Sequence, residues 1–169
     1  MNDGIRFSEL LAYNEEETLR WREWFAQNPT ALDLPLDIAN AKNVRGLLLH
    51  ISLVELHFAH IVAGLPSVNF QGVQKEIESS PADDGANLFA ISQESAAKYK
   101  RYLASATAED LALVFEFSPP RKLNASKRKL ITQALTHSMR HWAQLSTFLR
   151  QQGFEQPLVH DFLMSKAME

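Results

Sequence analysis

Four long stretches of the chain repeat apolar residues at steps of three and four, the spacing of one face of an α-helix. The second stretch stops at a Gly-Leu-Pro sequence and the fourth at a glycine, which are common signals for the end of a helix. The pattern therefore predicts four amphipathic helices of roughly 20 residues each. Their expected ranges are residues 7–27, 41–63, 86–104 and 126–153.

The segments between these stretches carry weaker signals. Residues 107–110 form a turn with the chemistry of a helix start. Residues 113–117 are predicted to be extended, because they favour β-structure and precede two prolines. Residues 34–36 and the Ser-, Pro-, Asp- and Gly-rich residues 79–85 are predicted loops, and a short helix is expected around residues 161–166. Amphipathic helices joined by modest loops predict an all-α four-helix bundle.

Length and charge narrow the class of protein. A chain of 169 residues can bury a hydrophobic core, and we expect one domain over residues 1–169. Its 17 basic and 20 acidic residues leave a net charge of -3, so no general attraction to nucleic acid is expected. The N-terminus lacks the pattern of a secretory signal, and no window approaches 18 uninterrupted apolar residues. We therefore expect a cytoplasmic protein with no membrane span.

Cysteine and histidine usage points to the candidate chemistry. The chain has no cysteine, which excludes disulfides, thiolate metal ligands and a cysteine nucleophile. It has six histidines, and five of them fall in two of the predicted helices. These are His50, His57 and His60 in the second helix, and His137 and His141 in the fourth.

A helical wheel of the second helix places His50 in the middle of its apolar face. His57 lies roughly 20° from His50 around the axis, but about 10.5 Å away along it. That distance is too long for the two to share one metal ion, so His57 is expected to be a core or pocket residue beside the site. The side opposite His50 is expected to be solvated and carries Arg45, Ser52 and Glu55.

In the fourth helix, His137 and His141 lie one turn apart, at or near the edge of the apolar arc. Two histidines at this spacing can present their imidazole nitrogens to a common point. With His50 as a third ligand, the set leaves coordination positions open, as in catalytic metal sites. Imidazole ligands suit zinc, nickel, iron or copper. The alternative is that the inward histidines are core residues that donate to backbone carbonyls.

Two further polar residues are candidates for this site. Gln144 follows His141 by one turn and is a candidate to orient a ligand or a metal-bound water; the alternative is a polar residue at the rim of the bundle. Asn14, on the first helix, is a candidate to line the mouth of the pocket, or else an interior polar residue.

Residues 135–153 of the fourth predicted helix contain LTHSMRHWAQL, then FLR and a glycine. This sequence follows the pattern His-x-x-x-His-x-x-Gln, apolar-Leu-Arg, Gly, and so resembles the closing helix of the DinB/YfiT-like superfamily. Residues 47–51 (LLLHI) resemble its second helix, which carries the remaining ligand, and residues 11–14 resemble its first. Many members have Arg-Gly after the last ligand, where this chain has Trp142 and Ala143.

The resemblance implies an up-down-down-up four-helix bundle, often a homodimer, with a divalent metal ion held by His50, His137 and His141. Functions known in the superfamily include thiol-dependent transferases, which use bacillithiol, mycothiol or glutathione, and a thiol-dependent maleylpyruvate isomerase. Many members have no known reaction, and likeness of fold is a poor guide to the reaction.

Together these observations predict a metal-dependent transferase or hydrolase whose three-histidine site activates a thiol cofactor or water, for example a thiol-dependent S-transferase. The expected cofactors are a divalent metal ion, preferably zinc or nickel, and a low-molecular-weight thiol. The expected partners are a small-molecule substrate and a second copy of the chain, without nucleic acid or membrane. Two alternatives stay open: a non-catalytic, stress-related bundle that binds a metal or small ligand, and a structural helical protein.

Overall fold

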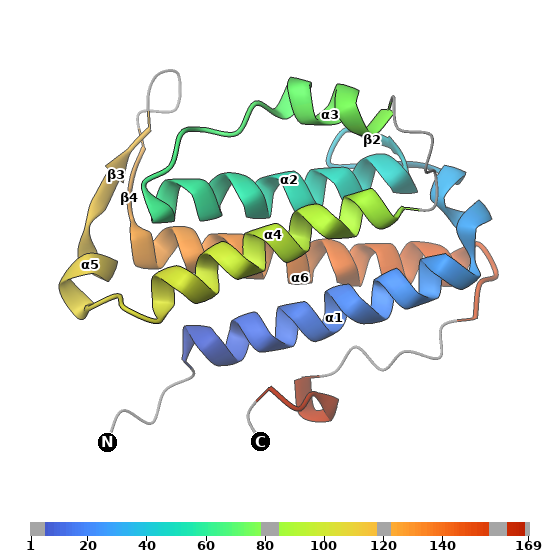
Figure 1. The fold of residues 1–169 in the computed structure, drawn as a ribbon. Coiled ribbons are helices and arrows are strands. Elements are labelled where there is room, and N and C mark those ends of the chain that lie inside the picture. Colours follow the sequence, from blue (N-terminus) through green and yellow to red (C-terminus); the bar gives the residue numbers. More distant parts are fainter. Residues whose placement is uncertain (1–5, 79–84, 118–122, 156–161, 168–169) are drawn as a thin grey trace.

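Four long helices form the body of the molecule. The computed structural model describes residues 6–78, 85–117, 123–155 and 162–167. The long helices are α1 (Phe7–Gln27), α2 (Val44–Ala63), α4 (Ala86–Leu103) and α6 (Lys127–Gln151). α1 and α6 run in one direction, and α2 and α4 run in the opposite direction (Figure 1). The predicted all-α fold class is confirmed, and each predicted long helix is present.

Side-chain caps and a glycine define the ends of the two helices that carry the histidines. The Asn43 side chain accepts a hydrogen bond from the backbone N–H of Gly46 at 2.8 Å, which starts α2. Ser126 accepts from the N–H of Lys129 at 3.2 Å and starts α6 in the same way. α2 ends at Gly64, whose φ of 72° lies in the left-handed region that glycine adopts without steric cost.

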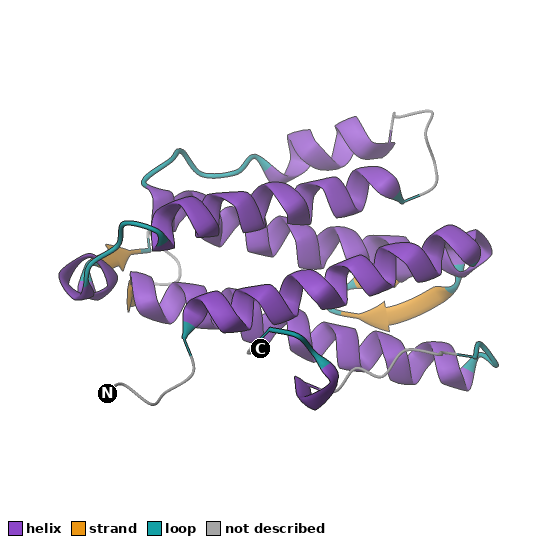
Figure 2. Ribbon diagram, turned by 60° about the horizontal axis from the view of Figure 1, so that its bottom comes forward, coloured by secondary structure: helices purple, strands orange, loops and turns teal. Residues whose placement is uncertain are grey.

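A short antiparallel hairpin lies at each end of the bundle (Figure 2). At one end β1 (Pro35–Ile38) pairs with β2 (Ala41–Asn43), and at the other β3 (Val114–Glu116) pairs with β4 (Asn124–Ser126). The predicted extended segment over residues 113–117 is therefore strand β3. Residues 41–43, predicted as the start of a helix, form β2 instead, because the cap at Asn43 delays the helix.

Several short helices fill the remaining connections. Thr107 accepts from the N–H of Asp110, whose carboxylate accepts from Thr107 in return, so the predicted helix start forms a reciprocal cap. The helix α3 was not predicted and packs over α2 (Figure 1). The short helices are η1 (Pro29–Asp33), α3 (Phe70–Glu78), α5 (Ala108–Ala112) and η2 (Phe162–Met164).

α2 is a core helix that packs against both α4 and α6. By length and composition it could cross a membrane, but 61% of its most apolar window is buried inside the molecule, and this burial accounts for its apolar composition. The prediction that Ser52 and Glu55 face solvent is wrong, since each is only 2% exposed. α4 covers this side of α2: Ser92 hydrogen-bonds Ser52, and the Tyr99 hydroxyl donates to the carbonyl oxygen of Glu55.

Aromatic residues pack α1 against α6. The rings of Trp21 and Trp142 stack with centroids 5.6 Å apart and planes 18° from parallel, and both side chains are buried. Trp142 is one of the two positions at which the sequence departs from the superfamily pattern. Its side chain serves the packing of α6 and is not part of the histidine group.

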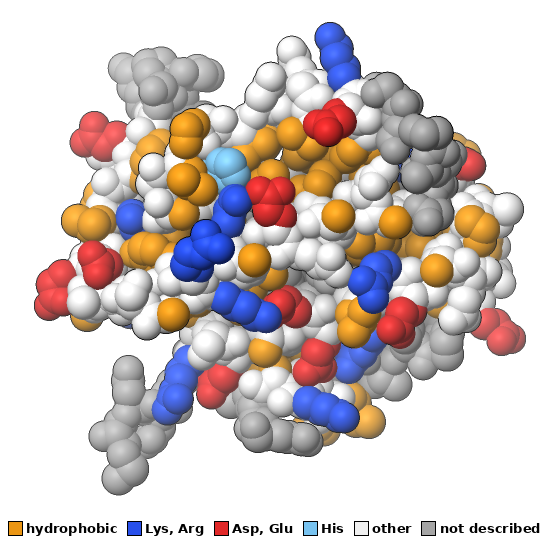
Figure 3. Space-filling view, viewed as in Figure 1, with side chains coloured by type: hydrophobic (Ala, Val, Ile, Leu, Met, Phe, Trp, Pro, Cys, Tyr) orange, Lys and Arg blue, Asp and Glu red, His pale blue; other side chains and the backbone are white. Residues whose placement is uncertain are grey.

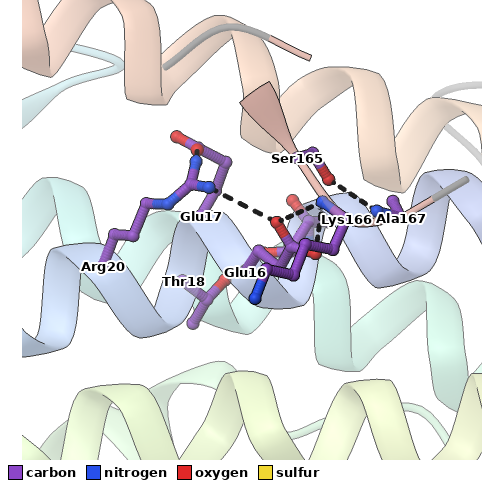
Figure 4. Close-up of polar contacts among 8 residues, drawn as sticks. Glu16, Glu17, Thr18, Arg20, Ser165, Lys166 and Ala167 are labelled. Carbon is purple, nitrogen blue, oxygen red and sulfur yellow. Dashed lines mark hydrogen bonds and ion pairs between the residues drawn. The ribbon is translucent and has the colours of Figure 1, made fainter. Parts of the chain in front are cut away.

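The C-terminal segment lies against α1 (Figure 4). The backbone N–H of Lys166 donates to both carboxylate oxygens of Glu16, at 3.1 and 3.3 Å. The ring of Phe162, in η2, contacts Tyr13 with centroids 4.8 Å apart. η2 falls within the short helix predicted around residues 161–166, of which residue 161 lies outside the described part of the chain.

Candidate metal centre

Three histidine side chains from α2 and α6 meet in one place. His50 Nε2 lies 3.1 Å from His137 Nε2, and His137 Nε2 lies 3.1 Å from His141 Nε2. One ring nitrogen of each residue lies within 4.8 Å of the other two. His137 and His141 are buried, whereas His50 is half-buried. The structure therefore brings together the three histidines that the sequence singled out.

The packing of α6 turns its two histidines inward. Leu130, Ala134 and Leu145 share their face of the helix and are all buried. Because His137 and His141 are one turn apart on this face, both side chains reach toward α2, which supplies His50.

Gln144 orients the ring of His141. Its side-chain oxygen, Oε1, lies 2.7 Å from His141 Nδ1. A carbonyl oxygen only accepts hydrogen bonds, so Nδ1 carries the ring proton and Nε2 presents a lone pair to the other two histidines. Such a contact holds an imidazole in the tautomer and direction that metal binding requires.

Burial favours the neutral form of all three imidazoles. It is the main cause that lowers the pKa of His137 to about 3, and the neighbouring His141, His50 and Arg140 lower it further through repulsion between positive charges. Burial is also the main cause of the lowered pKa of His50 and of His141. Neutral imidazole is the form that binds metal ions, so the group can take a cation at neutral pH.

Two of the three nitrogen–nitrogen separations in this group match those of imidazoles bound to one divalent metal ion. Zinc–imidazole bonds are about 2.0–2.1 Å long, and two of them at tetrahedral or octahedral angles separate the nitrogens by about 2.9–3.4 Å. The two separations of 3.1 Å fall within this range. Among the described residues the group contains no carboxylate, so three neutral ligands would leave the charge of the ion uncompensated and favour an anionic further ligand.

A groove of about 770 Å³ reaches His50 from the surface. It lies between α2, α3 and the start of α4, where Figure 3 shows hydrophobic side chains gathered in a hollow. Leu53 and Phe70 belong to its apolar wall, and Lys42 and Arg45 lie on its polar side. The described residues that line it include no acidic side chain. The groove can therefore accept a molecule with an apolar body and a negative charge.

The other predicted candidates lie away from the histidine group. The ring of His57 packs on that of Phe70, with centroids 5.3 Å apart. His60 Nδ1 lies 2.8 Å from the carbonyl oxygen of Pro66. Asn14 does not line the groove of His50; it is buried in a different cavity, between α1 and α4.

The buried carboxylate of Glu55 was missed as a site residue. Its Oε1 accepts hydrogen bonds from Ser138 Oγ at 2.5 Å and from Asn14 Nδ2 at 2.8 Å. Ser138 lies on α6, directly after His137, and Glu55 lies on α2. This hydrogen bond therefore joins the two helices that carry the histidines. One feature of the sequence could have identified it: Glu55 is the only acidic residue in the apolar stretch of residues 44–63.

Comparisons with known proteins identify the family and the fold of the chain. The profile of the DinB family matches residues 1–168. The fold is similar to that of the crystal structure of a DinB-like protein, YjoA, from Bacillus subtilis, with a TM-score of 0.56 and 14% sequence identity, over 88% of this chain and 96% of that chain. No curated protein matches the chain in sequence. Since the family profile covers nearly all of the sequence, the chain belongs to the DinB family.

Proposed function

We propose that the protein is a metal-dependent transferase or hydrolase in which His50, His137 and His141 hold one divalent metal ion, zinc or nickel. The observation that carries this proposal is the convergence of three imidazole nitrogens, with two separations of 3.1 Å, in a setting that keeps them neutral. A set of three protein ligands leaves coordination positions open, which is typical of catalytic rather than structural zinc sites.

A bound metal ion would supply one piece of chemistry, the lowering of the pKa of a thiol or water so that the nucleophile exists near neutral pH. Because the chain has no cysteine, a sulfur nucleophile has to come from a low-molecular-weight thiol. We therefore propose the transfer of such a thiol to an electrophilic small molecule. The alternative within this proposal is that the bound metal ion would activate water, and that the protein hydrolyses a small-molecule substrate.

The chain's own residues would bind and orient the reactants. Gln144 holds His141 with Nε2 facing the centre. In the groove beside His50, Phe70 and Leu53 offer an apolar surface to the substrate, and Lys42 and Arg45 attract an anionic group. His50 is half-buried and lines the groove, so a substrate in the groove would approach the histidine group from the side of His50.

Metal content tests the site directly. The protein is purified without an affinity tag, loaded with zinc or nickel, dialysed and analysed for bound metal. We expect about one ion per chain in the wild type and a large loss in His137→Ala and in His141→Ala. His60→Ala is the matched control, since His60 lies on α2 outside the group, and should keep the wild-type content. Substoichiometric metal in the wild type, or unchanged content in both α6 variants, would overturn the proposal.

Turnover tests the enzyme activity separately. The metal-loaded protein is assayed with glutathione and bacillithiol as thiols and 1-chloro-2,4-dinitrobenzene as the electrophile. We expect a rate above the uncatalysed background that is lost on chelation and in His137→Ala. Turnover that survives both treatments would contradict metal catalysis. Stoichiometric metal without turnover for any thiol or for water would favour the non-catalytic metal-binding bundle.

A further inference from the structure

A second cavity, of about 410 Å³, lies between α1 and α4, and none of the described residues that line it also lines the groove of His50. Glu55 lines this cavity, and its side chain is about 140° from that of His50 around the axis of α2. The inner wall of the cavity combines buried polar and buried apolar residues, whereas its mouth is more exposed. The buried polar residues of the inner wall are Asn14, Thr18, Glu55, Ser92, Ser95 and Tyr99.

The hydroxyl groups of the inner wall already have acceptors within the protein. The Tyr99 hydroxyl donates to the backbone carbonyl of Glu55 at 3.2 Å, and Ser95 donates to that of Ile91 at 2.9 Å. Ser92 hydrogen-bonds both Ser52, at 2.9 Å, and the carboxylate of Glu55. A ligand in this cavity therefore finds no hydroxyl donor that is free of a protein partner.

One acceptor, in contrast, lacks a donor. Asn14 is 5% exposed, and its Oδ1 has no hydrogen-bond partner among the described residues, while its Nδ2 donates to Glu55. A buried carbonyl oxygen without a donor is unfavourable, so the site favours a ligand that supplies one. Glu55 is the one acidic residue of the inner wall and is 2% exposed.

We propose that this cavity binds a small primary amine. Its ammonium group would donate to Asn14 Oδ1 and to the carboxylate of Glu55, and its alkyl or aryl body would pack on Leu11, Phe89 and Leu135, which line the same cavity. An alcohol lacks the charge that pairs with the carboxylate, and a carboxylic acid anion repels it.

The charge that favours a cationic ligand is that of Glu55, inside the cavity. At the mouth, Lys100 of α4 and Glu15 of α1 form an ion pair at 2.6 Å, so these two charges balance each other. Figure 3 shows acidic and basic side chains close together over α1 and α4. Arg22 also lies among the residues that line the cavity, and its positive charge opposes a cation at the mouth. Burial raises the pKa of Glu55, and a bound ammonium group would supply the positive charge that this buried carboxylate lacks.

Amide chemical shifts of the full chain, labelled with ¹⁵N, provide the test. The protein is titrated with n-butylammonium chloride, n-butanol and sodium butyrate at constant ionic strength. We expect saturable shifts in α1 and α4 with butylammonium, and at least tenfold weaker binding of the alcohol and of the anion. No saturable shift with butylammonium, or equal affinity for butanol, would overturn the proposal.

Substitutions then locate the binding. Glu55→Gln should weaken butylammonium binding at least tenfold, whereas Glu94→Gln, which changes an exposed carboxylate on α4, should leave it unchanged. Ala97→Trp fills the mouth from an exposed position without touching the buried hydrogen bonds, and should abolish binding even if Glu55→Gln fails to fold. Wild-type affinity in folded Ala97→Trp would overturn the proposal. Metal uptake should persist in Ala97→Trp, so this test is independent of the proposed enzyme function.

Discussion

One hydrogen bond decides which nitrogen of His141 faces His137. Without the Gln144 contact, nothing would hold the proton on Nδ1, and the ring could present either nitrogen to His50 and His137. Contacts of this kind contribute to metal affinity because they remove the cost of choosing a tautomer and an orientation.

Gln144→Leu should therefore lower metal affinity by about 10–100-fold while the helix stays intact. Competition with a chromophoric chelator measures this affinity. Gln133→Leu is the matched control, because Gln133 is an exposed glutamine on the same helix, outside the group. Equal affinities in the wild type and in Gln144→Leu would show that packing alone orients His141.

His137 should make the metal-free protein sensitive to acid. Its pKa is lowered from 6.5 to about 3 in the folded state. Below the unfolded pKa of 6.5, the unfolded chain binds a proton that the folded chain does not, so stability is lost as the pH falls from there toward the folded pKa. Urea unfolding at about pH 7.5 and about pH 5 should show a larger loss for the wild type than for His137→Gln. The same loss in both proteins would count against this assignment.

Single residues differ in how well they could be predicted. His137 and His141 could be identified because their spacing is local, and a wheel placed His50 on an inward face. Glu55 was assigned to solvent because a wheel shows which residues share a face, but not how many faces of the helix are covered. α2 is covered by α6 near the histidines and by α4 on the other side, so both its faces are buried.

At the scale of elements, the start of α2 depends on a single side chain. Asn43 caps the helix that carries His50, and residues 41–43 pair with β1 just before it. Asn43→Ala should lower the free energy of unfolding by about 0.5–2 kcal/mol, measured by urea denaturation. Asn43→Ser keeps a capping oxygen and should recover most of this stability. If the serine variant is as unstable as the alanine variant, the cap is not the cause.

The long helices could be predicted because each repeats its apolar spacing over several turns. α3 could not, since it is short, follows a stretch rich in turn residues and contains a glycine at position 72. The β1–β2 hairpin was also missed. Its turn places Ala39 and Asn40 at positive φ, of 54° and 62°, and alanine carries no sequence signal for that conformation.

For the whole molecule, a metal ion at the three histidines would connect α2 and α6. A ligand that binds only the folded state stabilises it by about 2.7 kcal/mol at 100 times its dissociation constant. Adding zinc or nickel should therefore raise the melting temperature of the wild type, and chelation should reverse the increase. His50→Ala should remove the effect, because it deletes the ligand from α2. A rise of equal size in His50→Ala would place the stabilising metal elsewhere.

The distance along the chain between the histidines has a consequence for synthesis. His50 and His137 lie 87 residues apart, and His141 follows only four residues later. No fragment that ends before α6 can hold all three side chains together, and loop closure over this length is slow compared with helix formation. The complete set of three imidazoles therefore exists only once α6 has been synthesised, so a metal ion held by all three would be acquired after that point.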